Sequence, residues 1–119
     1  MDRRARVGRR GEDAAAAAYA ARGFRVVARN WRCPLGEVDL VVEREGLLVF
    51  CEVKARSGTT FGGGFEAVTA AKRRKLRALA EVFLAGRDPP PASVRFDVAS
   101  VHTGPAGPSV QLFEDAFEG

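Results

Sequence analysis

Two apolar runs on either side of a short polar turn are the clearest pattern in the chain. They cover about residues 37–43 and 47–54, with Arg44, Glu45 and Gly46 between them. Runs of this length that are rich in valine and leucine predict two strands, and a two-residue loop predicts a β-hairpin. If Glu45 and Gly46 form the loop, Arg44 faces Leu47, and the pairing of all other residues in the hairpin follows from that register.

The predicted register divides the hairpin into an apolar face and a partly charged face. The apolar face, which we expect to lie under the helices, carries Val38, Leu40, Val42, Val49, Cys51 and Val53. On the other face Asp39 lies opposite Glu52, and Glu37 lies opposite Lys54. Opposed carboxylates destabilise a sheet unless they share a cation or lose a charge. We therefore expect a bound cation here, and the alternative is a splayed, solvated hairpin end with ordinary surface acids.

The remaining pattern predicts two helices and three further strands. Helices are predicted over about residues 8–22, an alanine-rich stretch before Gly23, and from an N-cap at Thr69 to about Ala85. Strands are predicted over 24–31, 93–101 and 109–113, with a glycine-rich loop at 57–64. This order predicts an α/β fold with a mixed central sheet flanked by helices, in which the strand after the second helix pairs in parallel.

Composition narrows the classes of protein that are compatible with this fold. A chain of 119 residues is long enough for one core, so we expect a single domain over residues 1–119. No apolar stretch is long enough for a membrane span or a signal sequence, which predicts a cytoplasmic protein without a membrane partner. With two cysteines and one histidine, a disulfide framework, a zinc site and a histidine-based catalytic triad are not expected.

The charge distribution is more informative than the net charge of +4. Five of the first ten residues are arginine, and a second cationic cluster lies in the second helix at Lys72, Arg73, Arg74, Lys75 and Arg77. Such clusters attract polyanions, and nucleic acid is the natural candidate. On charge alone, a cationic face that only confers solubility is an equally good interpretation.

The acids and the lysine of the hairpin together suit one kind of chemistry. Carboxylate ligands favour Mg²⁺, Mn²⁺ or Ca²⁺ over softer metals. Metal-assisted hydrolysis of a phosphodiester needs acids that hold the ion and a cationic group near the developing charge. Lys54 lies two residues after Glu52, so strand alternation places both side chains on one face.

A carboxylate in one strand followed by Glu-x-Lys in the next is similar to the signature of the restriction-endonuclease-like, or PD-(D/E)xK, nuclease superfamily. The wider pattern closely resembles the YraN family of uncharacterised bacterial proteins, in "GEDAAAAAYAARGFRVVARNWR", "GEVDLV", "FCEVKARSG", "VTAAK", "RFDVASV" and "EDAF". This resemblance covers nearly the whole chain. It implies a restriction-endonuclease-like αβββαβ core and an endonuclease or resolvase-type activity on DNA with Mg²⁺ or Mn²⁺.

The resemblance also implies roles for individual residues. Asp39, Glu52 and the carbonyl of Val53 would hold the metal, Glu12 would be a further acid beside it, and Lys54 would be the catalytic lysine. The proposed contacts to nucleic acid are Arg9, Arg10, Arg56, Lys72 and Arg73. Two positions depart from the pattern: Val38 stands where the superfamily has proline, and Phe113 where relatives often carry histidine.

These observations favour a metal-dependent DNA endonuclease that acts on branched or single-stranded DNA, with a homodimer as an open alternative to a monomer. The main competing interpretation is a nucleic-acid-binding or adaptor protein that keeps the nuclease-like fold without cutting. Away from the site, we expect Asp97 to form a salt bridge with a nearby arginine and Trp31 to be a core residue.

Overall fold

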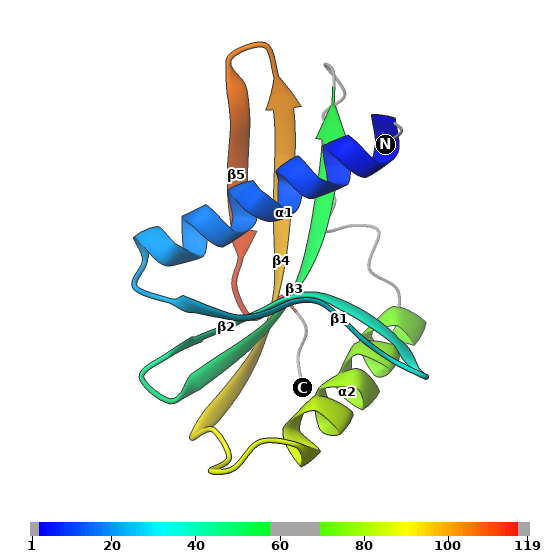
Figure 1. The fold of residues 1–119 in the computed structure, drawn as a ribbon, viewed down its shortest axis with the longest axis vertical. Helices are drawn as coiled ribbons and strands as arrows, with labels where there is room; N and C mark the ends of the chain where they lie inside the picture. Colours follow the sequence, from blue (N-terminus) through cyan, green and yellow to red (C-terminus); the bar gives the residue numbers. More distant parts are fainter. Residues whose placement is uncertain (1–2, 58–69, 117–119) are drawn as a thin grey trace.

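The strands form one strongly twisted mixed sheet with a helix on each face (Figure 1). The computed structural model describes residues 3–57 and 70–116. The elements are α1 (Arg3–Ala21), β1 (Arg25–Cys33), β2 (Gly36–Arg44), β3 (Leu47–Ser57), α2 (Ala70–Ala85), β4 (Ser93–Gly104) and β5 (Gly107–Phe113). Their order in the sheet is β1-β2-β3-β4-β5; β3 and β4 are parallel, and the other neighbours are antiparallel. The predicted α/β fold with an αβββαβ core is therefore confirmed.

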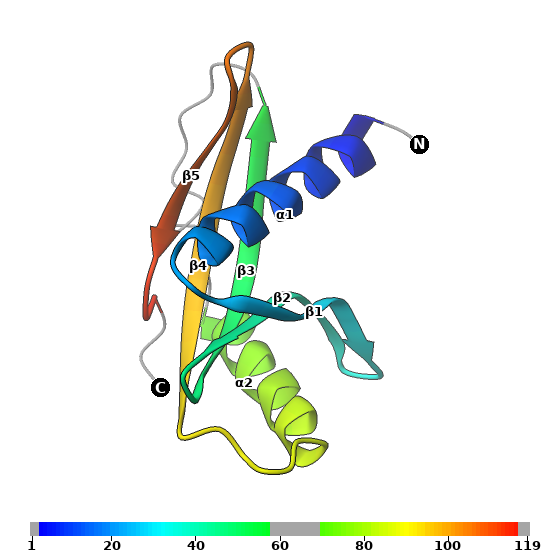
Figure 2. The same cartoon turned by 60° about the vertical axis from the view of Figure 1, so that its left-hand side comes forward.

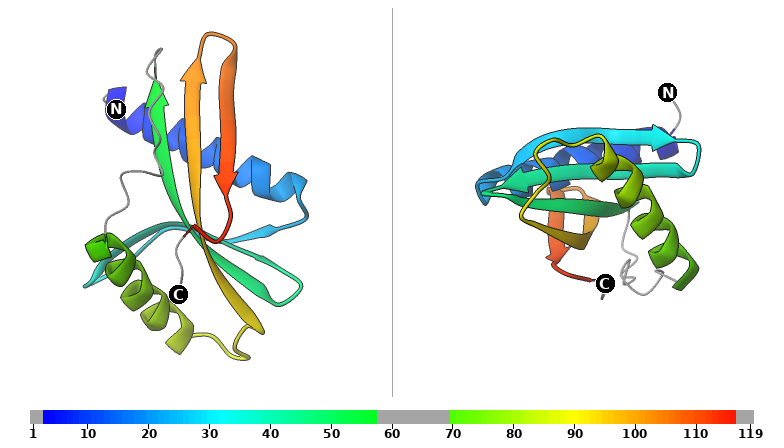
Figure 3. Two further views of the ribbon diagram at one scale, coloured as in Figure 1. Left: turned by 180° about the vertical axis from the view of Figure 1, so that it is seen from behind. Right: turned by 90° about the horizontal axis from the view of Figure 1, so that it is seen from below.

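The two helices cover opposite faces of the sheet (Figures 2 and 3). One core lies under α1 and contains Tyr19, Phe24, Leu40 and Cys51. The other core lies under α2, whose buried residues are Leu76, Leu79 and Ala80. The expectation that both helices cover the apolar face of the hairpin is therefore wrong. Both faces of the central strands are buried because each receives a helix.

Several elements extend beyond the predicted bounds. Helix α1 begins at Arg3 rather than at about Gly8, because arginine and alanine both favour helix. Strands β3 and β4 run in parallel register from Leu47 opposite Ser93 to Ser57 opposite Thr103, so each continues past its predicted end. The predicted loop at 57–64 and the N-cap at Thr69 fall almost wholly outside the described residues. No helix in the described ranges is long and apolar enough to cross a membrane.

The register of the central hairpin is confirmed near the turn and wrong at its far end. Glu45 and Gly46 have φ values of 48° and 82°, as a two-residue loop requires, and Arg44 pairs with Leu47. The ladder between β2 and β3 stops at Leu40 and Cys51. Asp39 and Glu52, and Glu37 and Lys54, are therefore not paired in the ladder as predicted. Glu37 instead forms an ion pair with Arg32 of β1 at 2.8 Å.

The separation of β2 from β3 follows from the twist of the sheet. Beyond Leu40, strand β2 continues in register with β1, where Val38 pairs with Trp31. Val38 is fully buried in the core under α2, not in the core under α1 as the predicted faces require. Trp31 also packs in the core under α2, edge to face with Phe83, as expected for a core residue.

Two contacts fix α1 across the sheet. The Tyr19 hydroxyl donates a 2.6 Å hydrogen bond to Asp97, a fully buried carboxylate that also accepts two bonds from Arg95 of the same strand. This is the salt bridge expected for Asp97. Near the middle of the helix, a Cβ at Gly11 would lie only 2.5 Å from the Cβ of Ala55 in β3. Glycine at this position therefore allows α1 to approach the sheet closely, next to Glu12.

Candidate functional site

Asp39 lies at the point where β2 and β3 separate. Its Oδ2 accepts a 2.8 Å hydrogen bond from the backbone N–H of Val53, and this contact replaces a rung of the ladder. Burial raises the pKa of Asp39 to about 6, and the negative charges of Glu52, Glu12 and Glu37 add to the rise, although the Val53 bond opposes it. Asp39 is thus a half-buried acid surrounded by other acids, an arrangement that favours a proton or a cation.

Glu52 lies on β3 and is held by two lysines from different elements. Lys72 Nζ of α2 lies 2.5 Å from Glu52 Oε1, and Lys54 Nζ lies 3.4 Å from the same oxygen. Burial lowers the pKa of Lys54, and the nearby Lys72 lowers it further. Burial alone would lower the pKa of Lys72 as well, but hydrogen bonds with Glu52 and Lys54 hold it above the usual value. The site therefore contains two ammonium groups with unequal proton affinities.

Glu12 reaches this region from α1, on the opposite face of the sheet from α2. Its Oε1 accepts a 2.9 Å hydrogen bond from the side-chain amide of Asn30 in β1 and lies 4.0 Å from Arg29 Nη2. The Glu12 side chain is 18% exposed, whereas the neighbouring Asp13 side chain is 60% exposed. Glu12 is thus the inward-facing acid of the pair. Its charge is one of those that raise the pKa of Asp39.

The donor chemistry suits a hard divalent cation. Asp39, Glu52, Glu12 and the Val53 carbonyl offer only oxygen atoms, which are the ligands that Mg²⁺ and Mn²⁺ prefer. Within residues 3–57 and 70–116, no three acid, histidine or cysteine side chains are gathered closely enough to hold an ion as they stand. Lys72 and Lys54 both contact Oε1 of Glu52, so a cation would bind a carboxylate whose charge is already balanced by ammonium groups.

A cavity of about 230 Å³ opens beside these groups. It is lined by the acids Glu37, Asp39 and Glu52 on the strands and by Lys72, Lys75, Leu76 and Leu79 on α2. Sequence reasoning did not assign Lys75 to the site. A signal was available, because Lys75 lies three residues after Lys72 and therefore on the same side of the helix.

The structure describes the side chains of most, but not all, of the cationic residues that are proposed to contact nucleic acid. Arg9 and Arg10 on α1 and Arg73 on α2 are exposed, and in the described part of the chain none of the three forms an ion pair. Six other arginines, in contrast, are paired with carboxylates: Arg22, Arg25, Arg29, Arg32, Arg87 and Arg95. The side chain of Arg56 lies outside the described residues. These three exposed arginines therefore lie in the N-terminal halves of α1 and α2.

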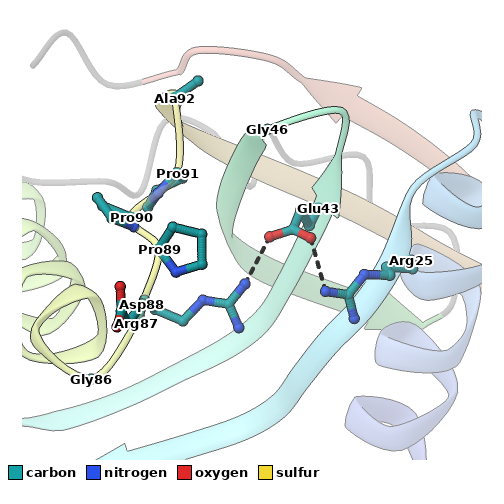
Figure 4. A pocket seen from close by; sticks show the side chains of 10 residues that line it. All are labelled: Arg25, Glu43, Gly46, Gly86, Arg87, Asp88, Pro89, Pro90, Pro91 and Ala92. Atoms are coloured by element: carbon teal, nitrogen blue, oxygen red, sulfur yellow. Dashed lines mark hydrogen bonds and ion pairs between the residues drawn. The ribbon is translucent and has the colours of Figure 1, made fainter.

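A second cavity, of about 630 Å³, lies at the other end of β2 and is walled by the proline run Pro89–Pro91 (Figure 4). Here Glu43 bridges two arginines, with Arg25 at 2.8 Å and Arg87 at 2.7 Å. The lining of this larger cavity contains two arginines and two acids, Glu43 and Asp88, so its formal charges balance. None of the catalytic, metal-binding or nucleic-acid-binding residues predicted from the sequence lines it.

Comparison with known proteins identifies the family. The model of a family described as "Uncharacterised protein family UPF0102" matches residues 11–101. A UPF0102 protein of Symbiobacterium thermophilum is 50% identical over 115 residues, which cover 94% of this chain and 96% of that protein. UPF0102 proteins of Parafrankia sp. and Frankia alni are 50% and 48% identical, over 82% and 93% of each chain. The chain therefore belongs to the UPF0102 family, the YraN family that its sequence resembles.

Proposed function

We propose that this protein is a metal-dependent DNA endonuclease that hydrolyses phosphodiester bonds in branched or single-stranded DNA. The observation that carries the proposal is the convergence of Asp39, Glu52 and Lys54 where β2 and β3 separate. Asp39 bonds the backbone of Val53, and Lys54 contacts Glu52 at 3.4 Å. Two acids and a lysine from adjacent strands, beside an open cavity, form the minimal set for this reaction.

Each residue of the set has a role that follows from its surroundings. Asp39, Glu52 and the Val53 carbonyl would hold Mg²⁺ or Mn²⁺, with Glu12 as a further acid on the side of α1. The bound ion would polarise the phosphate and activate water. Lys54 would stand beside the scissile phosphate and stabilise its developing charge through Nζ. Lys72 would exchange its contact with Glu52 for a contact with the DNA backbone.

The size of the cavity and the positions of the free cations both favour a polymer as the substrate. A volume of about 230 Å³ is smaller than the range of roughly 300–1,000 Å³ that is typical of pockets enclosing a whole small-molecule ligand. It suits one phosphate group that is presented by a longer chain. Arg9, Arg10 and Arg73 carry the exposed charge needed to hold the neighbouring backbone.

A non-cleaving nucleic-acid-binding or adaptor protein is the second candidate. The observation in its favour is the ion pair that Lys72 forms with Glu52, because it neutralises the acid that the cation would need. In that case the same arginines would bind DNA, and the acids and lysines would serve only to stabilise the fold.

The two candidates are separated by incubating the purified protein with labelled single-stranded, duplex and four-way-junction DNA. Each substrate is tested with Mg²⁺, with Mn²⁺ and with EDTA. The endonuclease proposal expects cleavage that requires a metal and disappears in Asp39→Asn. Asp88→Asn, which changes an acid beside the remote proline run, is the matched control and should cut normally. Salt-sensitive DNA binding without cleavage of any substrate would favour the adaptor, and cleavage that survives Asp39→Asn would contradict the proposed site.

A further inference from the structure

Asn30 has an unusual backbone conformation for a residue inside a strand. Its φ is 49°, in the left-handed region that non-glycine residues rarely adopt. The other two such residues in the described ranges are Glu45, in the hairpin loop, and Asp115, in a turn after β5. A turn explains both of those, but β1 continues on either side of Asn30. Backbone strain of this kind persists where the surrounding contacts impose it.

The side chain of Asn30 shows what those contacts are. Its Nδ2 donates a 2.9 Å hydrogen bond to Glu12 Oε1, while the preceding Arg29 donates a 2.6 Å bond to Asp13 of the same helix. In a regular strand, consecutive side chains point to opposite faces. The left-handed backbone at Asn30 is the departure that allows both residues to bond α1.

The strand register places the same residue next to the site. Arg29 pairs with Leu40 and Trp31 pairs with Val38, so Asn30 lies across from Asp39. Asn30 is therefore linked to Glu12 of α1 by its side chain, while its position in β1 lies across from Asp39 of β2. Among the described residues, Asn30 is the sole hydrogen-bond donor to Glu12, since Arg29 Nη2 lies 4.0 Å away and is too distant for a hydrogen bond.

We propose that Asn30 is a positioning residue that orients the Glu12 carboxylate through the hydrogen bond from its side-chain amide, so that Glu12 would be held ready to serve as a further acid for the metal. This inference rests on the proposed function, because it assigns Asn30 to the surroundings of that metal site. Hydrogen-bond donors of this kind orient metal-binding carboxylates, and removing one typically weakens metal binding by about 10- to 100-fold.

Asn30→Gly separates the hydrogen bond from the backbone strain, because glycine adopts the left-handed conformation at no steric cost. We expect its metal-free melting temperature to remain close to that of the wild type. Calorimetry with Mn²⁺ should show binding about 10-fold weaker than in the wild type. Glu45→Gly is the matched control, since Glu45 has nearly the same φ of 48° at the far end of the hairpin, and its Mn²⁺ affinity should be unchanged.

A double-mutant cycle with Glu12→Gln tests whether Asn30 acts through Glu12. In the Glu12→Gln background, Asn30→Gly should cause no further loss of Mn²⁺ affinity. The positioning role would be overturned if Asn30→Gly bound Mn²⁺ as tightly as the wild type. It would also be overturned if Asn30→Gly lost the same Mn²⁺ affinity in the wild-type and Glu12→Gln backgrounds. Either result would leave the metal site itself intact. If the wild-type protein does not bind Mn²⁺, both the proposed function and this inference are wrong.

Discussion

Lys72 Nζ and Glu52 Oε1 are 2.5 Å apart. The lysine lies on α2, which covers one face of the sheet, and the acid lies on β3, the central strand of the sheet. Lys54 contacts the same oxygen at 3.4 Å. Without a metal, Glu52 is thus neutralised by ammonium groups of the protein itself. A divalent cation and Lys72 would compete for the negative charge of the same carboxylate, and this competition has a measurable consequence.

Lys72→Met should bind Mn²⁺ more tightly than the wild type, because the ion no longer has to displace an ammonium group from Glu52. The metal-free variant should lose about 1 kcal/mol or less of unfolding free energy, since the ion pair is partly exposed. Calorimetry and urea denaturation measure the two effects. Arg73→Met, which removes the adjacent exposed charge, is the control and should change neither quantity appreciably. Weaker Mn²⁺ binding in Lys72→Met would show that the lysine supports the metal site rather than competing for it.

The raised pKa of Asp39 predicts a dependence of stability on pH. The folded-state value is about 6 and the ordinary value is 3.8, so the folded protein holds this proton more tightly than the unfolded chain. The stabilisation from the proton is complete below about pH 4 and is lost as the pH rises through 6. The unfolding free energy of the wild type should therefore fall between pH 4 and 6 relative to that of Asp39→Asn, as measured by urea denaturation. Parallel curves for the two proteins over this range would contradict the assigned environment of Asp39.

Much of the fold could be predicted from the sequence because the local signals were strong. Glu45 and Gly46 set the hairpin register. The spacing of three and four residues along α2 predicts a buried stripe of Leu76, Leu79, Ala80, Phe83 and Leu84; the first three are buried and the last two pack against the same core. The separation of β2 from β3 could not be predicted from the pairing rule. It depends on the pairing of β2 with β1, and a long-range twist of the sheet decides where one pairing gives way to the other.

The candidate site was predictable to a similar extent. Asp39, Glu52 and Lys54 were identified from the predicted register and strand alternation, and Val53 from the resemblance to the nuclease superfamily. The described structure brings the four residues together. The spacing did not reveal that Asp39 bonds Val53 instead of facing Glu52. The placement of Asn30 across from Asp39 could have been found by treating Pro34 and Leu35 as a two-residue loop, which pairs Cys33 with Gly36. The sequence does not indicate the left-handed backbone of Asn30, except that asparagine adopts this conformation more readily than most residues.

Gly11→Ala should destabilise the protein, although alanine is normally the better helix residue. The added Cβ would lie 2.5 Å from the Cβ of Ala55, so α1 would have to move away from β3. We expect a loss of about 1–3 kcal/mol in unfolding free energy, which urea denaturation would measure. Ala55→Gly should restore most of the loss in the double variant, because it removes the atom that clashes. A Gly11→Ala variant as stable as the wild type would show that α1 does not need this close approach.

Binding to DNA should depend on the exposed arginines and much less on the paired ones. Replacing Arg9, Arg10 or Arg73 by glutamine should weaken binding to any DNA sequence. Each change should reduce the slope of log affinity against log salt concentration by about 1. Arg25→Gln is the matched control, because Arg25 is paired with Glu43 at the remote cavity. Fluorescence anisotropy at several salt concentrations provides the measurement, and an equal effect of Arg25→Gln would argue against a localised DNA-binding surface.

Single-turnover cleavage of labelled DNA by Lys54→Met is the most direct test of the central claim that Asp39, Glu52 and Lys54 form a phosphodiesterase site. The comparison with the wild type is made at saturating Mn²⁺ and protein, so that differences in binding do not contribute. If Lys54 acts at the scissile phosphate, the rate should fall by at least about 100-fold while DNA and Mn²⁺ still bind. A Lys54→Met rate equal to that of the wild type would contradict the account.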